Sequence, residues 1–167
     1  HALVIDAENV YTNVNVNFGE GGTLTVTGNY YQMGGSLNLN STNAVMTVNG
    51  DLYIAGINNL GQVAKGSGRW WFSGNAVLNV DGDIIYNSSD KGGAGFSNVV
   101  INLKGDYISE TNSDCLATIN MIGDSDQLLD ITSESYISNF TKAKGKLIVD
   151  EYFKVRNLSS NLFIVPK

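Results

Sequence analysis

Apolar and polar residues alternate in short runs along most of the chain, as in LTVTGNYY at 24–31. This alternation has the period of a β-strand and not that of a helix. No segment keeps apolar residues at i, i+3, i+4 and i+7 over three helical turns. β-branched residues, which favour strands, are frequent in the same runs. The pattern therefore predicts an all-β protein.

A repeated unit accounts for this alternation. Its form is apolar-x-apolar-x-Gly-Asp/Asn-apolar-apolar, and it occurs as LTVTGNYY, MTVNGDLY, LNVDGDII and INLKGDYI. The motif glycines lie 22, 32 and 23 residues apart, at Gly28, Gly50, Gly82 and Gly105. A degenerate copy surrounds Gly123, and another begins near Leu147.

Units of about 22 residues that contain only strands and turns cannot bury their apolar face alone. Stacked on one another, they form a β-solenoid whose coils repeat at about 4.8 Å. We therefore predict a single-domain, right-handed parallel β-helix, with the hand taken from the general rule for parallel crossovers. A β-sandwich is the alternative, since it too is built from short strands and regular turns. The match between units favours the solenoid.

We expect one domain over residues 1–167, with an N-terminal cap at 1–13, regular coils at 14–108 and degenerate coils at 109–167. A chain of this length can bury one sizeable core. The longer second spacing falls where INNLGQVAKGSG, at 57–68, interrupts the pattern. Because this segment is Gly-rich and aperiodic, we predict an inserted loop.

Composition excludes several classes of function. Ten Lys and Arg face 16 Asp and Glu, and the net charge of −6 argues against nucleic acid or an anionic membrane as a partner. No run approaches the roughly 18 apolar residues of a membrane helix. One His and one Cys exclude the common zinc sites, a disulfide framework and most His-dependent catalysis. We predict a monomer that is not an enzyme, with Cys115 as a buried apolar residue.

The repeats resemble the degenerate coils of large secreted or surface proteins of bacteria, from about Val14 to Tyr152. The piece INMIGDSDQLLDITSESYISNFTKAKGKLIVDEYFKV is similar to the closing coils that follow such repeats. The resemblance implies a secreted or cell-surface location, within a larger multidomain protein, as an adhesin or spacer. The predicted fold also resembles that of β-helical carbohydrate-binding modules, although a fold does not imply a ligand.

The alternation also assigns faces to the strands. Thr25, Thr47, Asn79 and Asn102 should share one outward column, and Tyr31 and Tyr53 another. In RWWFS we align Trp71 with the inward Leu39, which places Trp70 and Phe72 outward. Exposed aromatic rings on a flat sheet can stack on sugar rings, while nearby polar groups bond the hydroxyls. Alternatively, these aromatic residues are buried beneath the 57–68 loop, because large aromatic residues are mostly buried.

We accordingly predict a non-catalytic carbohydrate-binding module for a plant-type polysaccharide, with xylan favoured. Its ligand-binding residues would be Trp70, Phe72, Tyr53, Tyr31, Arg69 and Gln62. A structural adhesin or spacer domain is the alternative function.

Acidic residues follow three of the motif glycines, at Asp51, Asp83 and Asp106. Carboxylates stacked one coil apart repel each other unless a cation or hydrogen bonds intervene. They are weak candidates for calcium, which prefers oxygen ligands, and turn bonds to their own backbone are the favoured explanation. A calcium-dependent polysaccharide lyase, with Arg69 as its basic residue, is the third functional hypothesis. We predict no other cofactor.

Overall fold

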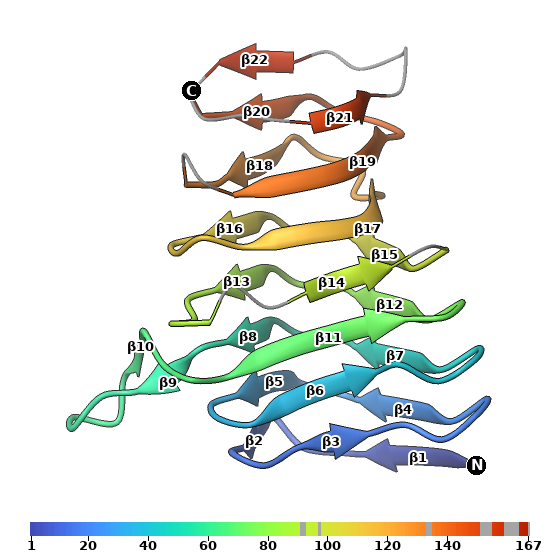
Figure 1. Cartoon of the computed structure of the whole chain (residues 1–167). Helices are drawn as coiled ribbons and strands as arrows, with labels where there is room; N and C mark the ends of the chain where they lie inside the picture. Colours follow the sequence, from blue (N-terminus) through green and yellow to red (C-terminus); the bar gives the residue numbers. More distant parts are fainter. Residues whose placement is uncertain (91–92, 97, 133–134, 151–154, 159–163, 167) are drawn as a thin grey trace.

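A computed structural model describes residues 1–90, 93–96, 98–132, 135–150, 155–158 and 164–166. Every regular element among these residues is a β-strand. The strands pair in parallel with the equivalent strands of neighbouring coils, and the chain winds through about six turns of a solenoid (Figure 1). The predicted solenoid is confirmed, and the alternative sandwich is not what the chain forms.

Each regular coil contributes one strand to each of three faces. The first face holds β1 (Ala2–Ile5), β4 (Thr23–Val26), β7 (Val45–Val48), β12 (Val77–Val80) and β15 (Val100–Leu103). The second face holds β2 (Asn9–Thr12), β5 (Asn29–Gln32), β8 (Leu52–Ile54), β13 (Ile84–Tyr86), β16 (Tyr107–Ser109), β18 (Gln127–Asp130), β20 (Leu147–Val149) and β22 (Ile164–Pro166). The third face holds β3 (Val16–Asn17), β6 (Ser36–Leu39), β11 (Arg69–Ser73) and β14 (Gly93–Phe96).

Two longer strands join the third face to the first in the C-terminal coils. The first half of β17 (Asp114–Met121) pairs with β14, and its second half pairs with β15. β19 (Tyr136–Lys142) pairs with β17 along both halves, and β21 (Val155–Leu158) pairs with β19. The repeat is degenerate here because the turn between these two faces has been replaced by continuous strand.

The inward positions of the first face are occupied by aliphatic residues in every regular coil. Val26, Val48, Val80 and Leu103 are in register with one another and almost completely buried. Burying one such side chain contributes about 1.5–3 kcal/mol relative to leaving it exposed. Because each coil repeats the pattern, these side chains stack into one core that runs along the axis.

The motif glycines allow one coil to approach the next at the corner between the first and second faces. A Cβ atom at Gly82 would collide with the Asp51 carboxylate and lie 2.8 Å from the Gly50 carbonyl oxygen. Any side chain at this position would separate the coils. The Gly-Asp/Asn pair is therefore a close-contact motif between consecutive coils.

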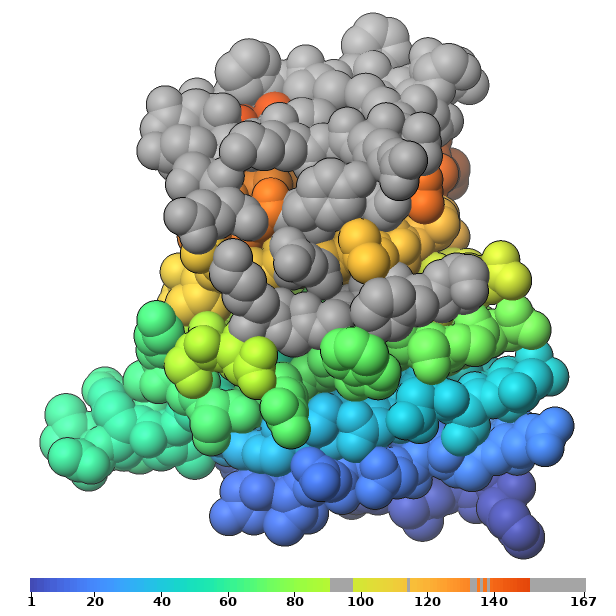
Figure 2. Space-filling view, viewed as in Figure 1, coloured from blue at the N-terminus to red at the C-terminus, as the bar shows by residue number. Residues whose placement is uncertain are grey.

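The predicted insertion at 57–68 forms a hairpin that projects from the stack. β9 (Gly56–Ile57) and β10 (Val63–Ala64) pair antiparallel, and the hairpin leaves after β8 and rejoins the coil before β11 (Figure 1). Figure 2 shows it standing clear of the body of the molecule. Leu60, near its tip, is 81% exposed.

The first 13 residues, where we expected an N-terminal cap, contain two strands that pair with the next coil. β1 pairs in register with β4, and β2 with β5. At the other end, β18 and β20 continue the second face through the segment predicted as degenerate coils. Residues 151–154, 159–163 and 167 of that segment lie outside the described part of the chain.

Candidate functional site

The tryptophan pair lies one residue out of the predicted register. In β11, Trp70 pairs opposite Leu37, Trp71 opposite Asn38 and Phe72 opposite Leu39. Trp70 and Phe72 are completely buried, while Trp71 is 44% exposed. The prediction that Trp70 and Phe72 face outward was therefore wrong.

A difference in turn length explains this error. Met46 and Leu78 are in register, yet seven residues separate Leu39 from Met46 and only six separate Phe72 from Leu78. The connection that follows β11 is thus one residue shorter than the one that follows β6. A shift of one residue moves every side chain of a strand to the opposite face.

Trp70 is part of the aromatic core. Its ring centroid lies 5.3 Å from that of Phe72, 5.3 Å from that of Tyr86 and 6.5 Å from that of Tyr107. Its indole Nε1 has no hydrogen-bond partner among the described residues. A buried donor without a partner costs about 1–3 kcal/mol, so the ring is held there by its packing. Neither Trp70 nor Phe72 can serve as a sugar platform in this position.

Tyr31 and Tyr53 share an outward column of the second face, as predicted, and Tyr11 extends it. The rings of Tyr11 and Tyr31 stack with centroids 4.5 Å apart and planes 17° apart. Those of Tyr31 and Tyr53 lie 4.4 Å and 4° apart. The facing sides of these rings are thus occupied by one another, and Tyr31 is only 9% exposed. Sequence reasoning missed Tyr11, although NVYT aligns with NYYQ.

The acidic column of the second face bonds to the backbone of the next coil. Asp51 Oδ1 accepts from the backbone N–H of Asp83 at 2.8 Å, and Asp83 Oδ1 accepts from that of Asp106 at 2.7 Å. Asp106 Oδ1 accepts from the N–H of Leu128 at 2.7 Å, and Asn29 occupies the same role before Asp51. The favoured prediction was that these carboxylates bond to the backbone of their own turn. That prediction was wrong, because each carboxylate oxygen accepts from a backbone N–H of the next coil.

Burial raises the pKa of Asp83. The hydrogen bond from the Asp106 backbone opposes this rise, and the charges of Asp106 and Asp51 add to it. Burial also raises the pKa of Tyr53, with the Asp51 charge as the next cause. The Tyr53 hydroxyl donates to Asp51 Oδ2 at 3.2 Å, which ties the tyrosine stack to the acidic column.

The described residues contain no group of three or more His, Cys, Asp or Glu side chains placed to hold a metal ion. Within the same residues, no helix is long and apolar enough to cross a membrane.

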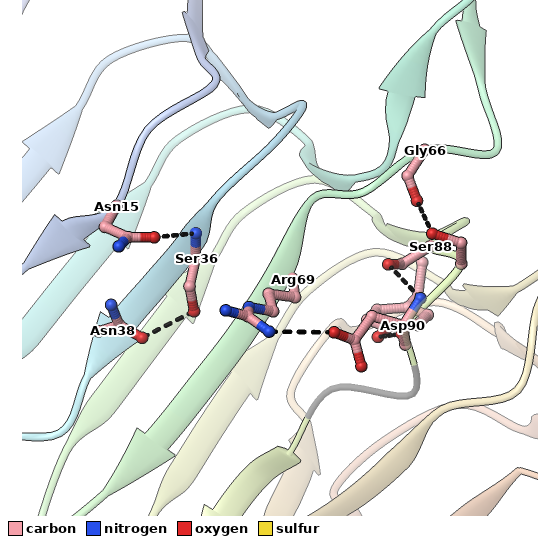
Figure 3. A network of polar contacts seen from close by, with 9 residues as sticks. Asn15, Ser36, Asn38, Gly66, Arg69, Ser88 and Asp90 are labelled. Carbon is pink, nitrogen blue, oxygen red and sulfur yellow. Dashed lines mark hydrogen bonds and ion pairs between the residues drawn. The ribbon is translucent and has the colours of Figure 1, made fainter.

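Arg69 and Gln62 lie away from the tyrosine stack. Arg69 Nη1 forms an ion pair with Asp90 Oδ2 at 3.1 Å, and both side chains are about half exposed (Figure 3). Gln62 is held in the hairpin turn, where its Oε1 accepts from Asn58 Nδ2 at 3.1 Å. The six predicted ligand residues are thus divided among the core, the second face and the region of the hairpin.

The outward column predicted on the first face is confirmed, and it forms a second ladder. Asn79 Nδ2 donates to Thr47 Oγ1 at 3.3 Å, and Asn102 Nδ2 donates to Asn79 Oδ1 at 2.9 Å. The ladder continues through Asn120, whose Nδ2 donates to Asn102 Oδ1 at 3.0 Å, to Thr141. Side-chain bonds of this kind join consecutive coils well into the degenerate part of the repeat.

Comparison with family models, curated proteins and solved structures finds no match. The likeness to bacterial secreted and surface repeats therefore stays a prediction. The function must be argued from the contacts of the chain itself.

Lys142 is a buried polar residue that the sequence analysis did not single out. It is 7% exposed, and its Nζ donates to the Gly123 carbonyl at 2.7 Å, the Ser125 carbonyl at 3.1 Å and Gln127 Oε1 at 2.6 Å. Burial lowers the pKa of Lys142, and the negative charge of Asp126 is the larger of the two charges that oppose this decrease. TKAKGK contains three lysines at alternate positions, and nothing in that pattern marks Lys142 as the buried one.

Proposed function

We propose that the chain is a non-catalytic structural module, a stiff β-solenoid spacer or adhesin segment within a larger secreted or cell-surface protein. The supporting observation is the use made of the outward polar side chains. Asp51, Asp83 and Asp106 cap the backbone of the next coil. The Asn and Thr column of the first face bonds along its own length.

These contacts stiffen the coil stack in addition to its backbone pairing. Each coil advances the chain by about 4.8 Å, so about six turns give a rise of about 30 Å along the axis. Nearest-neighbour contacts determine the stability of such a stack. Ladders that span several successive coil boundaries resist bending at each boundary that they cross.

The acidic column supports this proposal over the lyase hypothesis. One oxygen of each carboxylate is already bonded to the neighbouring coil, and Asp51 Oδ2 also accepts from Tyr53. Arg69, the basic residue that a lyase would need beside these acids, is ion-paired with Asp90. A rigid structural role accounts for both arrangements without a reaction.

Single-molecule FRET across the stack tests the proposal. Dyes attached to cysteines at Gly19→Cys and Lys144→Cys report the distance between a turn near the N-terminal coils and an exposed site in the C-terminal coils. A Cβ atom at Gly19 meets nothing within 4 Å. Cys115 is buried, and burial raises the pKa of its thiol to about 12, so native Cys115 should not be labelled.

A spacer predicts one narrow distance distribution that neither a chelator nor a polysaccharide changes. A matched sample unfolded in urea gives the broad distribution for comparison. A broad native distribution, or a distance that shifts when the chelator is added, would contradict the spacer.

A further inference from the structure

Trp71 lies on the third face beside neutral polar residues. It pairs in register with Asn38, which pairs with Asn17 one coil further toward the N-terminus. These three residues form one outward column that runs along the solenoid axis. Trp71 is 44% exposed, and on its other side it pairs with Gly93, so a large apolar ring lies between two amides and a glycine in this column.

Local hydrogen bonds hold the amides of this column. Asn38 Nδ2 donates to Asn17 Oδ1 at 2.8 Å, and Asn38 Oδ1 accepts from Ser36 Oγ at 2.7 Å. The backbone N–H of Ser36 in turn donates to Asn15 Oδ1 at 2.9 Å (Figure 3). A side-chain amide has two donors and two acceptor lone pairs. One fixed bond on each side of Asn38 therefore leaves it further capacity for a ligand, in a defined orientation.

The charge of this region favours a neutral ligand. Arg69 is next to Trp71 along the outward side of β11, and its ion pair with Asp90 cancels its charge locally. Ser36, paired opposite Arg69, is neutral, and the positions on either side of Trp71 are the amide of Asn38 and Gly93. The net charge of −6 over the whole chain disfavours long acidic polymers.

We propose that this column binds an extended, neutral polysaccharide that lies along the solenoid axis. The indole face would pack against the C–H face of one pyranose, while Asn38 and Asn17 would bond hydroxyls of the following units. Successive coils are about 4.8 Å apart, which is close to the length of one sugar unit in an extended β-1,4-linked chain. The repeat of the protein and that of the ligand would therefore match over three positions.

Affinity electrophoresis through gels that contain arabinoxylan, glucomannan, mixed-linkage β-glucan or pectin tests this site. At least one neutral polysaccharide should retard the protein, and Trp71→Ala should weaken that binding about tenfold or more, as expected for a central aromatic contact. Tyr11→Ala is the matched control, because Tyr11 is an exposed aromatic residue on a different face, and it should bind normally. Retardation by pectin alone, by none of the gels, or undiminished in Trp71→Ala would overturn the proposal.

Tryptophan fluorescence provides a second readout that does not depend on gel mobility. The chain has two tryptophans, and only Trp71 is exposed. Titration with the retarding glycan should shift the emission of the parent protein and leave Trp71→Phe, which keeps Trp70, unshifted. Asn38→Ala should weaken binding about two- to tenfold through a lost hydrogen bond, and affinity should rise with oligosaccharide length up to about three units. An equal shift in Trp71→Phe would contradict the site, whereas the spacer function does not depend on either result.

Discussion

Asp83 Oδ1 accepts a hydrogen bond from the backbone N–H of Asp106 at 2.7 Å, across the boundary between two consecutive coils. The same bond joins Asp51 to Asp83, and Asn29 to Asp51. This contact explains why the residue after the motif glycine is Asp or Asn, since both have an Oδ1 acceptor at the same place. In the degenerate copy the equivalent position is Leu128. Its backbone N–H donates to Asp106 Oδ1, but its side chain has no oxygen that could accept a bond from the following coil.

Asp83→Ala should lower the free energy of unfolding by about 1–2 kcal/mol, because it leaves the Asp106 N–H without its acceptor. Asp83→Asn keeps an oxygen in that position and should cost much less. Urea denaturation followed by circular dichroism measures both variants. Equal losses in the two would show that the Oδ1 contact is not what stabilises the coil boundary.

The stability contributed by Asp83 should depend on pH. Its pKa is raised in the folded state from the ordinary value of 3.8, so the folded protein holds this proton more tightly than the unfolded chain. The contribution is fully present below the ordinary pKa and is lost as pH rises through the folded pKa.

Asp83→Asn removes this titration. The free energy of unfolding of the variant, relative to the parent, should therefore increase between about pH 3.5 and pH 7. Urea denaturation at several pH values within this window measures the difference. A difference that decreases as pH rises would refute this sign.

Lys142→Met should destabilise the protein by about 1–3 kcal/mol, because two backbone carbonyls and Gln127 Oε1 lose a buried donor. Lys144→Met is the matched control in the same segment. Lys144 forms an exposed ion pair with Asp124 at 3.0 Å, and such pairs contribute about 0–1 kcal/mol. Thermal and urea unfolding of the two variants should separate them clearly. Similar losses would mean that the bonds of Lys142 to the turn do not stabilise the fold.

Trp70→Ala should cost about 3–5 kcal/mol, since it removes a completely buried ring from the aromatic core. Trp71→Ala, one residue away in the same strand, should cost less than about 1 kcal/mol, because Trp71 lies on the surface. Urea denaturation of both variants tests the register of β11 directly. A larger loss of unfolding free energy in Trp71→Ala than in Trp70→Ala would support the register that the repeat alignment predicts.

Much of the fold was predictable because the same pattern of apolar and polar residues recurs in several repeat units. Thr25, Thr47 and Asn79 were expected to share an outward column, and the structure places them in register, with Leu24, Met46 and Leu78 buried beside them. The column of Tyr31 and Tyr53 followed from the same alignment. Within each unit the first strand, the motif glycine and the second strand keep the same spacing, so a match in sequence is also a match in space.

The candidate site was less predictable because it depends on turn lengths and on contacts between coils. One residue fewer after β11 exchanges the faces of Trp70 and Trp71, and neither side chain reveals this by its type. The stacking of Tyr31 between Tyr11 and Tyr53 depends on the distance between coils. The burial of Lys142 depends on carbonyl groups far from it in the sequence.

The sequence by itself determined the strand period, the stacking of coils that repeat about every 22 residues and the position of the insertion at 57–68. These properties are local or repeated, and alternation and glycine spacing are sufficient to specify them. Only the tertiary structure decided which tryptophan is exposed, which backbone amides the acidic residues cap and which lysine is buried. The physical reason is that a side chain of a solenoid finds its partners in the neighbouring coils, about 20 residues away, and one residue in a connecting turn changes all of them.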